Sequence, residues 1–98
     1  MSRTLLTPQE LADALIALPD WEMVNSGKAI RRLFTFQNFN AAFGFMTRIA
    51  MHAEKLNHHP EWSNVYNKVE VTLTTHSSHG ITKLDIQMAE IMDRLGSS

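Results

Sequence analysis

The stretch from Asn38 to Asn57, NFNAAFGFMTRIAMHAEKLN, contains no proline and repeats apolar residues at helical spacing. Asn38 is a suitable N-cap, Asn57 can end the helix, and Pro60 prevents its continuation. This is the longest helix that the sequence predicts, and we expect it to form the backbone of the core. The apolar positions assigned to its buried face are Phe39, Ala42, Phe43, Met46, Ile49, Ala50, Ala53 and Leu56.

The residues before this helix predict a shorter helix and a hairpin. Thr7 to Glu10 combine an N-cap, a proline at the first helical position and a capping-box acid, and the helix they start should end before Pro19. Next, residues 21–24 and 29–36 flank Asn25-Ser26-Gly27, a turn whose glycine can take a positive φ.

The residues after it predict a second hairpin and a last helix. Apolar residues alternate with polar ones from Lys68 to His76, which is typical of a strand with one buried face, and its partner strand covers residues 62–65. Beyond Gly80, Thr82 and Asp85 form a second capping-box pair. The helix that follows is marked by Leu84, Met88, Ile91, Met92 and Leu95 and ends at Gly96.

The predicted order is therefore helix, hairpin, helix, hairpin, helix, within a single domain spanning residues 1–98. Two hairpins and three helices favour an α+β fold with one antiparallel four-stranded sheet and all helices packed on one face. The uncovered sheet face and the edge strands of so small a domain lead us to expect self-association.

Composition narrows the possible partners. Nine basic and ten acidic residues give a formal charge of -1, which provides no broad positive field for nucleic acid or an anionic membrane. The sequence has no cysteine, and no stretch approaches the about 20 apolar residues of a membrane span. We expect a soluble, cytoplasmic protein.

Three of the five histidines are candidates for chemistry. His58 and His59 follow the end of the long helix, and His76 lies at the end of the alternating strand. If the two hairpins pair through their central strands, these imidazoles could converge on one pocket. Such a set could hold a catalytic zinc ion or perform metal-free acid-base catalysis, and we favour the second because the adjacent pair is an awkward chelate. His52 and His79 have no feature that distinguishes them from ordinary surface histidines.

The spacing of seven residues resembles a known signature. Glu54 is followed at fixed intervals by His58-His59-Pro60, Tyr66, His76 and Asp85, which is similar to the pterin-4a-carbinolamine dehydratase family. The resemblance extends through FNAAFGFMTRIA and PEWSNVYNKVEVTLTTH and covers nearly the whole chain. It implies an α+β enzyme that dehydrates 4a-hydroxytetrahydropterin to quinonoid dihydropterin. That reaction recycles the pterin cofactor of aromatic amino acid hydroxylases, and the family forms dimers or tetramers.

The resemblance also implies roles for individual residues. The catalytic residues would be His58, His59 and His76, acting without a metal or a further cofactor because the pterin is the substrate. The pterin would be held by Asn57, His58, His59, Thr74, Thr75, His76 and Ser77, with Trp21 bordering the same pocket. Glu54 would support the site by orienting a histidine, although a surface carboxylate is an equal alternative. Asp85 fits better as the capping acid of the last helix than as a catalyst.

Two positions depart from the animal members of the family, because Ser63 stands where they carry an aromatic residue and Glu70 where they carry a histidine. Animal members also serve as a dimerisation cofactor of a transcription factor. A non-catalytic binding module on the same fold is therefore the alternative function, and it would depend on an exposed helix face or sheet edge. The intact set of histidines favours the enzyme.

Overall fold

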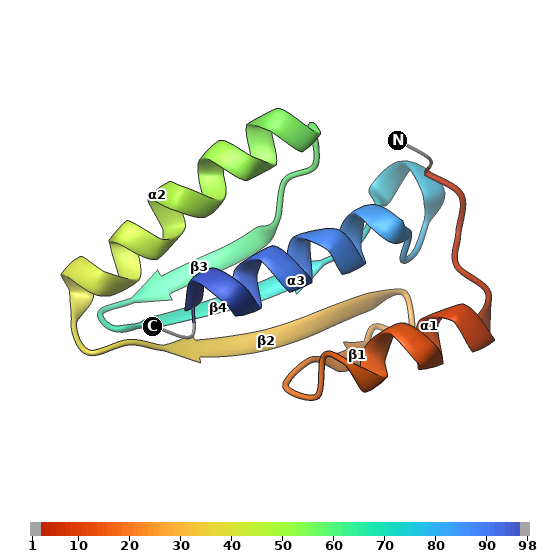
Figure 1. Cartoon of the computed structure of the whole chain (residues 1–98), viewed down its shortest axis with the longest axis horizontal. Helices are drawn as coiled ribbons and strands as arrows, with labels where there is room; N and C mark the ends of the chain where they lie inside the picture. Colours follow the sequence, from red (N-terminus) through yellow and green to blue (C-terminus); the bar gives the residue numbers. More distant parts are fainter. Residues whose placement is uncertain (1–2, 97–98) are drawn as a thin grey trace.

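The computed structural model describes residues 3–96, so the extreme ends of the predicted 1–98 domain lie outside the described residues. Helices and strands follow one another in the predicted order (Figure 1). The elements are α1 (Pro8–Ile16), β1 (Glu22–Val24), β2 (Ala29–Thr35), α2 (Phe39–Leu56), β3 (Glu61–Val65), β4 (Lys68–Leu73), the short 3-10 helix η1 (His76–Ser78) and α3 (Lys83–Gly96).

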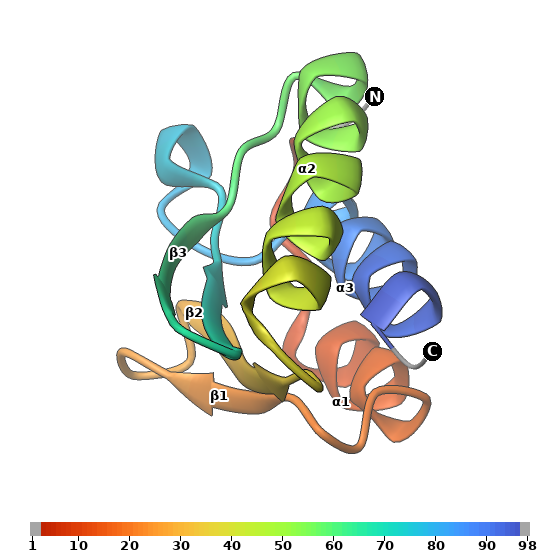
Figure 2. The same ribbon diagram turned by 90° about the vertical axis from the view of Figure 1, so that its left-hand side faces the viewer.

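The four strands form one sheet in the order β1-β2-β4-β3, with every neighbouring pair antiparallel. The two hairpins join through their central strands, where Ile30 lies opposite Leu73 and Phe34 lies opposite Val69. All three helices cover the same face of this sheet (Figure 2). The predicted α+β class is confirmed, and no helix within residues 3–96 covers the other sheet face.

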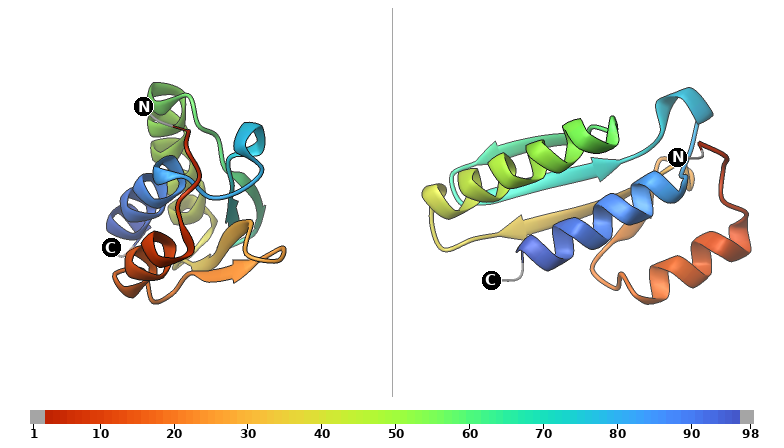
Figure 3. Two further views of the ribbon diagram at one scale, coloured as in Figure 1. Left: turned by 90° about the vertical axis from the view of Figure 1, so that its right-hand side faces the viewer. Right: turned by 45° about the horizontal axis from the view of Figure 1, so that its top comes forward.

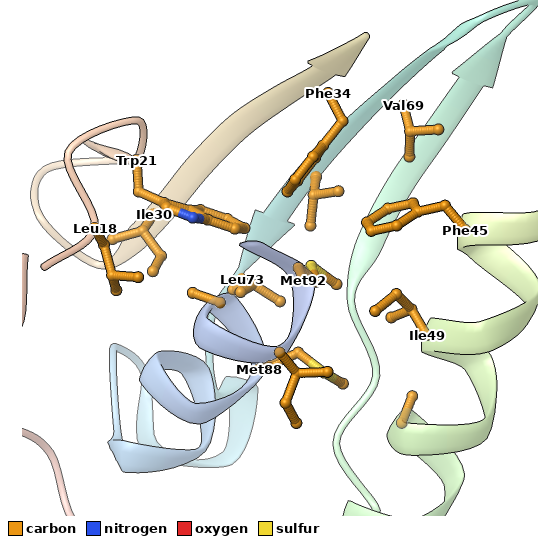
Figure 4. Close-up of a cluster of buried hydrophobic side chains, with 14 of the residues drawn as sticks. Leu18, Trp21, Ile30, Phe34, Phe45, Ile49, Val69, Leu73, Met88 and Met92 are labelled. Atoms are coloured by element: carbon orange, nitrogen blue, oxygen red, sulfur yellow. The ribbon is translucent and has the colours of Figure 1, made fainter. Parts of the chain in front are cut away.

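The core lies between the sheet and the helices (Figure 4). The ring of Phe45 on α2 lies 4.9 Å, centroid to centroid, from the ring of Phe34 on β2. Met88 and Met92 of α3 are fully buried beside them, as the spacing of the last helix predicts. Aromatic rings and flexible methionines therefore fill the space between α2, α3 and the central strands.

The buried face of α2 differs from the predicted one. Phe43 is 54% exposed and Phe45 is fully buried, whereas the sequence had assigned Phe43 to the core. These two positions lie about 200° apart around a helix, so only one of them can face the sheet. Phe45 takes that place because it also packs against Phe36. The residues that α2 buries are Ala42, Phe45, Ile49 and Ala53, while Phe39, Phe43 and Ala50 form an exposed apolar stripe on its outer side.

The end of β4 also differs from the predicted one. The strand ends at Leu73, and His76 lies in η1 rather than on the sheet. Just past the last pair of the ladder, the Thr74 hydroxyl donates to the Lys28 carbonyl at 2.7 Å. Thr75 then makes an isolated bridge to Gly80, which closes the loop that carries His76.

Local signals in the sequence are confirmed at the helix and turn boundaries. Thr7 and Glu10 form the predicted capping box of α1, and the backbone N–H of Thr7 lowers the pKa of the Glu10 carboxyl. Gly27 has the positive φ that the first turn requires, at 79°. Asn57 ends α2 in the left-handed conformation, with φ 51°.

The two phenylalanines of α2 provide a test of this packing. Phe45→Ala should lower the free energy of unfolding by about 3–5 kcal/mol, because it removes a fully buried ring and leaves a cavity. Phe43→Ala should change the unfolding free energy of the monomer by less than about 0.5 kcal/mol. Urea denaturation of the two variants measures both values. Equal losses would contradict the orientation of α2.

Candidate active site

The adjacent histidines point in different directions because of the way α2 ends. The left-handed Asn57 turns the chain away from the helix axis, and the backbone N–H of His58 bonds to the Ala53 carbonyl at 3.0 Å. After this turn the His58 side chain is 5% exposed, whereas His59 is exposed to solvent. One helix terminus thus supplies one buried and one accessible imidazole.

A buried hydrogen-bond network holds His58. Its Nε2 lies 2.6 Å from Oδ1 of Asp85, which is fully buried in the first turn of α3. The second oxygen of Asp85 accepts from the Thr75 hydroxyl at 2.8 Å and from the Thr82 N–H at 2.9 Å. The two threonine hydroxyls are themselves 2.8 Å apart. Asp85 therefore caps α3 as predicted, and it also fixes the ring of His58, which the sequence did not indicate.

The other two candidate histidines each have an exposed carboxylate partner. Nε2 of His59 lies 2.5 Å from Oε2 of Glu54, one turn back on α2. Nε2 of His76 lies 3.3 Å from Oε2 of Glu61 at the start of β3. Each of the three imidazoles thus has a different carboxylate as its partner, and the contacts of His58 and His59 are hydrogen bonds. In a neutral ring that donates its N–H from Nε2, Nδ1 is the free base.

A hollow of about 350 Å³ lies beside His76. It is lined by Asn25, Lys28, Ala29, Glu61, Thr74, His76 and His79. Thr74 and His76 were predicted as site residues, but Lys28, Glu61 and His79 were not. No local motif marks these three, because the pairing of β2 with β4 brings Lys28 to the loop that contains His79, and the pairing of β3 with β4 adds Glu61. Neither His58 nor His59 lines this hollow.

The remaining predicted residues lie around the same end of the sheet, with Thr75 in the buried network and Ser77 exposed in η1. The ends of α2 and β4 and the loop with η1 lie at this end of the sheet (Figure 3). Arg3 links Asn57, at the end of α2, to η1, which contains His76 and Ser77. Its guanidinium donates to the Asn57 carbonyl at 2.8 Å, and its own carbonyl accepts from the Ser78 hydroxyl.

Trp21 lies apart from the histidines. Its side chain is buried in the core, and its Nε1 donates to Oδ1 of Asp93 at 2.8 Å. The rings of Trp21 and Phe34 pack in a T-shaped, edge-to-face arrangement. The hollow that Trp21 borders, of about 500 Å³, is a different one that also includes Arg31 and Arg32. Its place at the substrate pocket stays a prediction.

The described residues contain neither a metal-binding cluster nor a membrane-spanning helix. Within residues 3–96 no group of three or more His, Cys, Asp or Glu side chains is placed to hold a metal ion. In the same range no helix is both long enough and apolar enough to cross a membrane.

The fold and the site define the class: a small α+β protein in which one antiparallel sheet, backed by helices, carries three histidine–carboxylate pairs at one end. The sequence model of the family described as pterin 4 alpha carbinolamine dehydratase matches residues 4–95. The chain belongs to this family.

Bacterial relatives are similar along their whole length. A protein of Chelativorans sp. (strain BNC1) is 55% identical over 93 residues, which is 95% of either chain. A protein of Rhizorhabdus wittichii is 55% identical over 95 residues, covering 97% of this chain and 98% of that protein. Both carry provisional names as pterin-4-alpha-carbinolamine dehydratases.

Solved structures show the same fold. A crystal structure from Brucella melitensis, described as a transcriptional coactivator/pterin dehydratase, has a TM-score of 0.89 and 53% identity, covering 93% of this chain and 97% of that one. A pterin dehydratase-like protein described as a RuBisCO assembly factor of the alpha-carboxysome has a TM-score of 0.70 at 19% identity. That second likeness covers 81% of this chain and 92% of the other, and it concerns the fold alone.

The two carboxylates next to the adjacent histidines should differ in their effect on stability. Asp85→Ala should lower the unfolding free energy by about 3–5 kcal/mol, because it leaves buried donors on His58, Thr75 and Thr82 without an acceptor. Glu54→Ala removes an exposed partner and should cost less than about 1 kcal/mol. Urea denaturation of both variants provides the comparison, and a tolerated Asp85→Ala would contradict the buried network.

Proposed function

We propose that the protein dehydrates 4a-hydroxytetrahydropterin to quinonoid dihydropterin by histidine acid-base catalysis. Membership of the family supports the pterin substrate. The observation that carries the catalytic part is the set of three imidazoles, each paired with its own carboxylate at one end of the sheet, two of them through hydrogen bonds. Imidazoles suit this reaction because they both donate and accept protons near neutral pH.

The environments of the histidines favour different roles. His59 and His76 have side chains that are 55% and 76% exposed, so a substrate can reach them. One of them, as an imidazolium, donates a proton to the C4a hydroxyl while the C–O bond breaks and water leaves. The other, as a neutral ring, accepts a proton from the pterin ring system. His58 is closed off by Asp85 and acts as a positioning residue for the chain on which His59 lies.

Replacement of each accessible histidine tests this division. His59→Ala and His76→Ala should each lower kcat by about 100- to 10,000-fold, because a proton donor or acceptor is lost. The substrate is generated enzymatically, and its dehydration is followed by ultraviolet absorbance against the uncatalysed rate.

A matched control is available on α2. His52 is half-buried there and lies outside the histidine–carboxylate pairs, so His52→Ala should retain turnover. Wild-type turnover in the double variant His59→Ala/His76→Ala would contradict the proposal. In that case the fold would serve binding rather than catalysis.

We also propose that copies of the chain associate through the exposed stripe of α2. Phe39 and Phe43 are 47% and 54% exposed, and their rings lie 5.6 Å apart, so together they present a contiguous apolar surface. Such surfaces commonly mark protein contacts. The coactivator name of the Brucella melitensis relative makes a different protein partner the second candidate for this stripe.

Light scattering after size-exclusion chromatography tests self-association. Phe43→Ser should shift the protein to a smaller species without changing its fold, because the side chain is exposed in the monomer. Lys68→Ser, on β4, is a surface control that should leave the mass unchanged. A wild-type monomer at every concentration would overturn this assignment and leave the stripe to another partner.

A further inference from the structure

The hollow beside His76 is lined by a positively charged side chain, that of Lys28, which the proposed reaction does not require. Lys28, in the first turn, lines this hollow and forms no ion pair with any of residues 3–96. The pterin ring system carries no anionic group that would match its ammonium. Lys28 is exposed, so with a neutral substrate its ammonium would be paired with solvent alone.

The other charged or titratable side chains that line the hollow are Glu61, His76 and His79. The Glu61 carboxylate is 3.3 Å from the imidazole of His76 and is directed to that ring. His79 has a left-handed backbone, with φ 60°, at the end of η1. Lys28 and His79, with the Asn25 side chain, are thus three potential donors around one opening.

A phosphate monoester is the chemical group that such a set recognises best. It has three acceptor oxygens and about two negative charges at neutral pH. A lysine ammonium binds it as a point charge, and neutral donors occupy the other oxygens. Because His76 lines the same hollow, this group would have to be attached close to the reacting pterin.

We propose that Lys28, His79 and Asn25 form a phosphate subsite, and that the preferred substrate is a pterin whose C6 side chain carries a phosphate monoester. This inference rests on the proposed function, since it takes the reacting pterin to lie between His59 and His76 and places only the phosphate in the hollow beside His76. It adds a class of substrate, the phosphorylated tetrahydropterins.

The ratio of kcat/KM for a phosphorylated pterin to that for its unphosphorylated parent measures the preference. In the wild type this ratio should be about 10, as expected for a charge-assisted contact at a partly open site. Lys28→Met keeps most of the apolar stem and should lower the ratio to about 1, chiefly by raising KM for the phosphorylated substrate. Lys28→Arg should retain most of the wild-type ratio, because it keeps the positive charge.

Lys68→Met is the matched control, because Lys68 is an exposed lysine at the start of β4, away from the hollow at its end. It should leave the ratio unchanged. A wild-type ratio near 1 would overturn the phosphate subsite while leaving the dehydratase intact. An equal loss for both substrates in Lys28→Met would also overturn it, because Lys28 would then contact the shared ring.

Binding without turnover separates this inference from the proposed reaction. Fully oxidised pterins cannot be dehydrated, and their fluorescence reports binding to the wild type and to Lys28→Met. The phosphorylated form should bind about 10-fold more tightly to the wild type only, and inorganic phosphate should compete with it but not with the unphosphorylated form. Equal affinities, or phosphate bound without competition, would contradict the subsite even if no dehydration were detected.

Discussion

The Asp85 carboxylate joins the end of α2 to the segment between β4 and α3. It accepts hydrogen bonds from His58 after α2, from Thr75 after β4 and from the Thr82 backbone at the start of α3. A buried carboxylate is costly unless donors surround it, and here three donors and the helix N-terminus satisfy it. Because the same group caps a helix and fixes an imidazole, the site cannot be separated from the fold that carries it.

The spacing of the family signature has a physical explanation in these contacts. Glu54 and Asp85 are its first and last positions, and they are the partners of the two adjacent histidines. The contact from Glu54 is local, since it spans one turn of α2 and the chain reversal at Asn57. The contact from Asp85 is long-range and exists only because α3 packs beside the end of α2. One signature therefore combines a helix terminus with a tertiary contact.

Local chemistry made much of this fold predictable, and long-range packing accounts for the errors. Thr7, Gly27 and Asn57 have conformations that their residue types favour regardless of context, and the structure confirms all three. The orientation of α2 depended instead on whether Phe43 or Phe45 meets Phe34 of β2 and the nearby Phe36. Both satisfy helical spacing, so only the position of the sheet decides between them. The hollow with Lys28 escaped prediction for the same reason, because strand pairing creates it.

The side chains of the three histidines differ in how well the protein orders them, so the geometry for catalysis depends in part on the substrate. Only His58 is packed against the core, whereas His59 and His76 depend on carboxylates that are themselves exposed. Exposed ion pairs contribute about 0–1 kcal/mol, which is too little to fix an imidazole within the tolerance that proton transfer demands. The remaining order has to come from binding of the substrate between the loop with η1 and the end of α2. Truncated pterins should therefore lose turnover as well as affinity, because contacts remote from C4a help to align the reacting groups.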